Sequence, residues 1–131
     1  MTGERGSISV WLVALSLALI IAIGWAVDGS RKALAHSEAT SVAEEAARAA
    51  GQALRLQALT AGQVAEVTPH HAIDEAERYL ATAGVTGTVA VQGNRIVVDI
   101  TISKTTIFLD VIGISEFTVH GHGVADLLSE K

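Results

Sequence analysis

The most prominent pattern in the chain is an uncharged apolar run over residues 8–27, ISVWLVALSLALIIAIGWAV. At about 1.5 Å per residue, a helix over this run is about 30 Å long and matches the hydrocarbon core of a bilayer. Trp11 and Trp25 lie near its ends, where aromatic rings favour the membrane interface, and charged residues resume at Asp28. The run exceeds an ordinary signal-peptide core and predicts a retained transmembrane helix, with a cleaved secretory signal as the alternative.

The next segment, residues 28–60, is rich in Ala, Glu, Gln and Arg and is predicted to form a helical stem. Small apolar residues recur along it at alternating spacings of four and three, forming a seam of Ala35, Ala39, Val42, Ala46, Ala49, Ala53 and Leu56. Such a seam needs a partner, either the chain's own outer domain or a helix of another subunit. Because glycine destabilises helix interiors, we expect Gly29 to bend or interrupt the helix just outside the membrane.

A second, shorter helix is predicted to follow the stem. Thr68 is suited to be its N-cap and Pro69 its first residue, and Gly84 is suited to be its C-cap. One face of this helix is apolar and comprises Ile73, Ala76, Leu80 and Ala83.

Residues 88–92 and 95–102 alternate between apolar and polar side chains on either side of Gly93-Asn94, which predicts a β-hairpin with a type II′ turn. A two-residue turn fixes the register and brings the apolar side chains to one face. The predicted pairs are Gln92 with Arg95, Val91 with Ile96, and Val89 with Val98.

The rest of the chain predicts a short helical turn closed by Gly113 and then a third strand over residues 116–125. Phe117 and Val119 are expected to point inward, and alternating glycines late in the strand favour close approach to another backbone. Parallel and antiparallel placement of this strand both remain open. The predicted fold is α+β, with boundaries at 1–7 (tail), 8–27 (transmembrane helix), 28–60 (stem) and 61–131 (outer α/β domain).

Charge and residue type exclude several functions. The net charge is −5, and the nine basic residues form no cluster that would bind a nucleic acid. The chain has no cysteine, which excludes disulfides and Cys-ligated metals. His70-His71 and His120-x-His122 are expected to be exposed polar residues rather than metal ligands. We expect no metal, no cofactor and no enzymatic activity, since no catalytic motif is present.

Three stretches resemble Tad/Flp pilus-assembly proteins of the TadE-like and TadG-like type. RGSISV at residues 5–10, with the apolar run ending in AVD at 26–28, resembles the opening of that family. AEEAARAAG at residues 43–51 resembles its Ala-rich stem, and IFLDVIGI at 107–114 resembles its C-terminal pattern.

The resemblance implies a pilin-like or pseudopilin-like subunit that crosses the bacterial cell membrane once, with a cytoplasmic N-terminus and an extracytoplasmic C-terminal domain. The flanking charges by themselves do not decide this orientation. In the TadE branch, a prepilin peptidase cleaves after a glycine, and a glutamate five residues further on helps subunits to dock. Cleavage between Gly6 and Ser7 would place Trp11 at that position here. This departure favours an uncut anchor or a cap-like minor subunit over a major pilin.

The sequence therefore predicts a membrane-anchored, non-enzymatic subunit of a Tad/Flp-type pilus or related secretion apparatus. Its expected partners are the lipid bilayer and other pilus-assembly or pilin-like subunits. A membrane-anchored ligand-binding or sensor domain is the alternative, and it requires a concave outer surface with convergent polar groups. A secreted protein released by signal peptidase is the third hypothesis.

Overall fold

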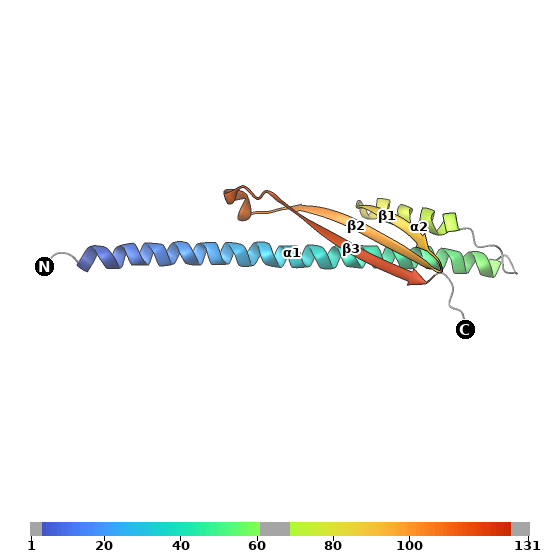
Figure 1. Ribbon diagram of the computed structural model, residues 1–131, viewed down its shortest axis with the longest axis horizontal. Coiled ribbons are helices and arrows are strands. Elements are labelled where there is room, and N and C mark those ends of the chain that lie inside the picture. Colours follow the sequence, from blue (N-terminus) through green and yellow to red (C-terminus); the bar gives the residue numbers. More distant parts are fainter. Residues whose placement is uncertain (1–3, 61–68, 127–131) are drawn as a thin grey trace. The chain divides into compact units, whose positions relative to one another are not determined.

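The computed structural model describes residues 4–60 and 69–126 (Figure 1). Its elements are, in order, α1 (Glu4–Thr60), α2 (Pro69–Ala83), β1 (Thr86–Gln92), β2 (Arg95–Thr105), the 3-10 helix η1 (Leu109–Ile112) and β3 (Glu116–Asp126). The predicted α+β fold is confirmed. The chain forms two compact units: a helix–loop unit, Met1–Ala33 with Thr105–Phe117, and a sheet unit, Leu34–Lys104 with Thr118–Lys131.

Helix α1 contains the predicted transmembrane segment and stem without a break. Its N-terminal part is long and apolar enough to cross a membrane, and the large apolar side chains of residues 8–27 are exposed. The expected interruption at Gly29 is wrong, because the helix continues through it. A Cβ added at Gly29 would meet no atom within 4 Å, and the residues that follow, Arg31, Lys32 and Ala33, are good helix formers. The helix begins at Glu4, inside the predicted tail, and extends to Thr60.

The hairpin of β1 and β2 has the predicted register. Gln92 pairs with Arg95, Val91 with Ile96 and Val89 with Val98. Gly93 has φ of +61°, and no non-glycine residue described has a positive φ. That combination requires glycine at the first turn position and identifies the predicted type II′ turn.

Strand β3 adds to the other side of β2, giving the order β1-β2-β3. Cross-strand contacts join Thr101 to His120 and Ser103 to Thr118, and the N–H of Thr106 donates to the carbonyl of Ser115. Residue numbers in β3 fall as those in β2 rise, so the two strands are antiparallel. The direction of β3, which the sequence left open, is thereby decided.

Helix α2 and the part of α1 that belongs to the sheet unit cover the apolar face of the sheet. The centre of this face is formed by Ile96, Val98, Ile100 and Ile102 of β2. Helix α2 begins at Pro69 and ends at Ala83, just before Gly84 with its φ of +70°. It buries Ala72, Ala76 and Leu80. Ile73 is half-buried and Ala83 is exposed, so the predicted apolar face is rotated toward Ala72. Thr68, the predicted N-cap, lies outside the described residues.

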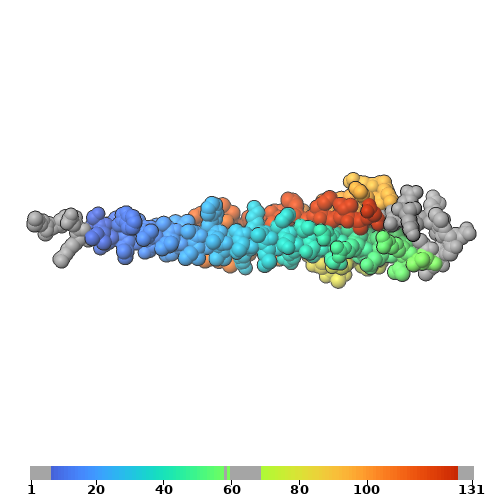
Figure 2. All heavy atoms as spheres, turned by 90° about the horizontal axis from the view of Figure 1, so that it is seen from below, coloured from blue at the N-terminus to red at the C-terminus, as the bar shows by residue number. Residues whose placement is uncertain are grey.

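Strand β3 lies directly on the backbone of α1. The atoms of the two elements lie side by side in Figure 2. A methyl group added at Gly121 would overlap the carbonyl of Ala39, and one at Gly123 would overlap that of Ala43. Further along, Ala125 approaches Gly51, so the strand and the helix run in the same direction. Four helical residues advance about 6 Å and two strand residues about 6.6 Å. Every second residue of β3 therefore meets every fourth residue of α1. The close approach predicted from alternating glycines is confirmed.

Candidate functional site

The first candidate site lies in the helix–loop unit, where Asp28 of α1 meets the tip that joins β2 to β3 (the tip, residues 106–115). Asp28 is only 3% exposed. Its Oδ1 accepts the backbone N–H of Ile107 at 3.3 Å, and its Oδ2 accepts those of Phe108 at 3.1 Å and Leu109 at 2.9 Å. One carboxylate thus binds three consecutive amides that are about 80 positions away in the chain.

These three amides open the 3-10 helix η1, whose first N–H groups have no partner within the helix. Phe108 occupies the N-cap position and makes no side-chain capping bond. Asp28 supplies the missing acceptor from α1. At the other end of η1, Gly113 adopts φ of +90° and closes the turn, as predicted, by donating to the carbonyl of Asp110 at 3.0 Å.

The charge state of Asp28 follows from the same contacts. Desolvation by burial raises the pKa of Asp28. The N–H groups of Leu109, Ile107 and Phe108 lower it, with a further contribution from the positive charge of Arg31. The lowering effects prevail and hold the pKa below the ordinary value of 3.8. Asp28 is therefore a carboxylate at neutral pH, and its hydrogen bonds to the tip are charge-assisted.

One helical turn before Asp28, Gly24 provides the space in which the tip lies. A methyl group at Gly24 would come within 3.1 Å of three carbon atoms of Phe108. Gly24 and Asp28 are buried and four residues apart, so they form one face of α1. A groove of about 420 Å³ runs beside this face, between the apolar surface of α1 and the tip.

The two tryptophans and the predicted processing residues lie elsewhere on α1. Trp11 and Trp25 are both exposed. Gly6 and Ser7 lie within the first turns of the helix rather than in an extended tail.

The predicted stem seam is buried in part. Ala35, Ala39 and Ala46 are buried in the sheet unit, whereas Leu56 is 63% exposed. The other members of the seam, Val42, Ala49 and Ala53, are half-buried. The face that α1 buries (the alanine face) comprises Ala35, Ala39, Ala43, Ala46, Ala47, Ala50 and Leu54. Of the two partners considered, the chain's own outer domain therefore occupies the centre of this face.

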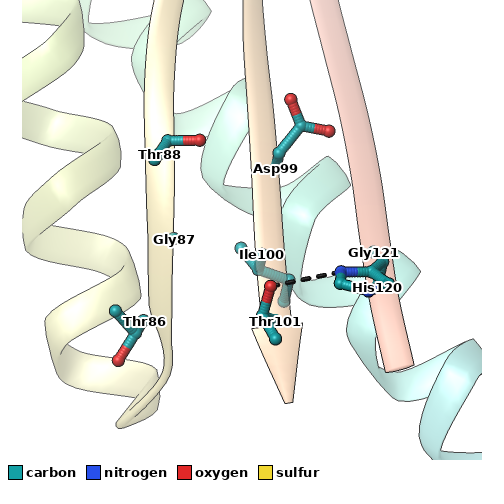
Figure 3. Close-up of a pocket in the computed structure, with 8 residues that line it drawn as sticks. All are labelled: Thr86, Gly87, Thr88, Asp99, Ile100, Thr101, His120 and Gly121. Atoms are coloured by element: carbon teal, nitrogen blue, oxygen red, sulfur yellow. Dashed lines mark hydrogen bonds between the residues drawn. The ribbon is translucent and has the colours of Figure 1, made fainter. Parts of the chain in front are cut away.

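The second candidate site is the exposed face of the sheet. A shallow hollow of about 440 Å³ is lined by hydroxyl groups of β1 and β2, by Asp99 and by His120 (Figure 3). Nδ1 of His120 lies 3.2 Å from the hydroxyl of Thr101, and Nδ1 of His122 lies 2.7 Å from Oδ1 of Asp99. Within residues 4–60 and 69–126, no three His, Cys, Asp or Glu side chains converge as metal ligands would. His70 and His71 are exposed at the start of α2.

Sequence reasoning missed the partners of Gly24 and Asp28. Gly24 lies within the apolar run, where glycine is compatible with a transmembrane helix, and Asp28 is the first charged residue after that run. Neither residue therefore indicates a contact with another part of the chain. The spacing of four between them placed both on one helix face, but nothing local connects that face to residues 107–109.

Residues 6–53 match the family model described as "Putative Flp pilus-assembly TadE/G-like". This segment is similar to the TadE/G-like family. The match includes the apolar part of α1, the capping residue Asp28 and most of the alanine face, and it confirms the resemblance to the Tad/Flp pilus-assembly family. No curated protein and no solved structure matches the chain.

Proposed function

We propose that the chain is a membrane-anchored, non-enzymatic subunit of a Tad/Flp-type pilus or a related secretion apparatus. In this proposal residues 8–27 cross the bacterial cell membrane, the N-terminus is cytoplasmic, and residues 61–131 are extracytoplasmic. The observation that carries the proposal is the TadE/G-like match over residues 6–53, which coincides with the exposed apolar surface of α1. An apolar helix with outward-facing side chains is stable when lipid or other apolar helices surround it.

The distribution of buried residues on α1 suggests where other subunits bind. Ala39 and Ala43 pack against β3, so the centre of the alanine face is already occupied. Leu34 is 73% exposed on the same helix and is available to a neighbouring helix. We therefore assign subunit contacts to the outward side of α1 around Leu34 and to the apolar segment, where small residues permit close helix packing.

The proposal is tested by deleting the gene in its own bacterium and counting surface pili by electron microscopy. Loss of pili, restored by the full chain, is the expected result; normal piliation in the deletion strain contradicts the proposal. A photo-crosslinking amino acid at position 34 is expected to capture other pilus-assembly subunits. The matched control is the same amino acid at the exposed sheet position Thr88, which should capture none of them.

The alternative, an anchored extracytoplasmic ligand-binding domain, is favoured by one observation. The hollow on the exposed sheet face brings Thr88, Asp99, Thr101 and His120 together. This function predicts that a small polar molecule raises the melting temperature of the chain, that His120→Ala abolishes the effect, and that deletion of the gene leaves pili unchanged.

A further inference from the structure

The tip is more apolar than an exposed loop of a water-soluble domain. Val111 is 86% exposed and Ile112 71%, and Ile107, Phe108 and Ile114 are also exposed. Asp110 is the one charged residue in the sequence of the tip, TIFLDVIGIS. Connections between strands that face water are normally built from polar residues and glycine. A contiguous exposed apolar surface of this kind marks an interaction site.

The surroundings of the tip indicate what covers it. Phe108 lies against Gly24, one turn inside the end of the apolar segment, or about 6 Å from the level of Asp28. The groove beside it is lined by Leu17 and Ile21 of α1 and by Val111 and Ile112 of the tip. The apolar side chains of the tip are therefore continuous with the surface of α1 that faces lipid. Interfacial segments reach about 5–10 Å into the boundary between headgroups and acyl chains, which is the same range.

The backbone of the tip is also prepared for a medium without water, where each unpaired N–H group is costly. The N–H groups of Ile107, Phe108 and Leu109 donate to Asp28. Other N–H groups of the tip donate to carbonyl groups within the tip itself; these are the N–H groups of Thr106, Val111, Gly113 and Ile114. The hydroxyl of Thr106 donates to the carbonyl of Ile114. These bonds pair most of the N–H groups of the tip within the protein.

We infer that the tip dips into the outer leaflet of the bilayer that holds α1, with acyl chains covering Val111 and Ile112 and filling the groove. Asp28 fixes this insertion by capping the inserted turn. The domain thus has a second membrane contact beside its anchor. The inference rests on the proposed anchor and adds to it a lipid-binding surface on the tip, which lies outside the TadE/G-like segment.

The experiment uses the full chain in vesicles of phosphatidylethanolamine and phosphatidylglycerol. Because the chain has no cysteine, single cysteines can be introduced and spin-labelled without a background signal. Val111→Cys tests the tip, Leu17→Cys reports the anchor, and Thr88→Cys is the water-exposed control on the sheet. Collision of each label with oxygen, which concentrates in lipid, is compared with collision with a water-soluble nickel chelate.

The expected result is that the label at position 111 behaves like that at position 17, with nickel collisions lost relative to position 88. Ile112→Cys should give the same result and guards against an effect of one substitution. If position 17 is in lipid but positions 111 and 112 collide with nickel as position 88 does, the insertion is refuted and the anchor stands. If position 17 is itself in water, the anchor and the insertion are both refuted.

Discussion

Gly121→Ala provides the sharpest test of how the sheet unit is held together. A methyl group at this position would overlap the carbonyl of Ala39 and lie 2.8 Å from the backbone nitrogen of Thr40. Both neighbours are backbone atoms of α1 and cannot rotate away. Ordinary contact begins near 3.4 Å, so the strand and the helix must separate by about 0.6 Å or more. A gap of about 0.5–1 Å forfeits a quarter to a half of the dispersion attraction across an interface.

The expected cost is large for a small domain. Overpacking usually lowers the free energy of unfolding by about 1–3 kcal/mol. Because the contact is with rigid backbone, we expect a loss of about 3 kcal/mol for this substitution. With an m-value of about 1.5 kcal/mol/M, the urea midpoint should fall by roughly 2 M. Pulse proteolysis of the full chain in detergent micelles, across a urea series, measures this midpoint.

Two variants serve as controls for this prediction. Gly29→Ala makes the same chemical change where no atom lies within 4 Å, and it should stabilise the helix by up to about 1 kcal/mol. Ala39→Gly combined with Gly121→Ala should not restore stability, because the overlap is with the carbonyl of Ala39 and not with its methyl group. Full rescue by Ala39→Gly, or an unchanged midpoint in Gly121→Ala, would refute the backbone contact.

Three other predictions concern α1 and the tip. The N–H donors outweigh desolvation and lower the pKa of Asp28, so its hydrogen bonds to the tip should be complete above pH 3.8 and be lost as the carboxylate protonates at lower pH. The amide proton shift of Leu109 should follow this change, and Asp28→Asn should abolish the pH dependence. Gly24→Leu should displace Phe108 and accelerate hydrogen exchange at residues 107–109, whereas Gly29→Leu should leave that exchange unchanged. Mass spectrometry of the native protein should find the peptide bond after Gly6 intact, and a mature chain beginning at Ser7 would contradict an uncut anchor.

Local patterns predicted the local structure well. The hairpin register followed from two facts that lie close together in the sequence, the Gly93-Asn94 turn and the alternation on either side of it. The short turn closed by Gly113 and the start of α2 at Pro69 followed in the same way. Each of these features depends on residues within one turn or one strand, where steric rules and hydrogen-bond rules act directly.

The face of α1 was predicted less well, for a geometric reason. A heptad spacing assumes a helix that supercoils around another helix, and a straight helix drifts about 20° per heptad from that repeat. Since α1 packs on a strand, its buried face follows the straight-helix period. Over three heptads the drift amounts to about 60°. It turns Leu56 of the predicted seam away from the sheet, whereas Leu54 is buried. The capping of residues 107–109 by Asp28 was beyond reach because it joins groups about 80 positions apart.

The paired glycines of β3 also restrict which polypeptides can exchange with it. Domain swapping and donor-strand exchange replace one strand by another, and they succeed when the incoming segment fits the vacated place. Any segment with a side chain at either glycine position would collide with the main chain of α1. The place beside that helix therefore suits a strand with glycine at both positions and disfavours most other sequences.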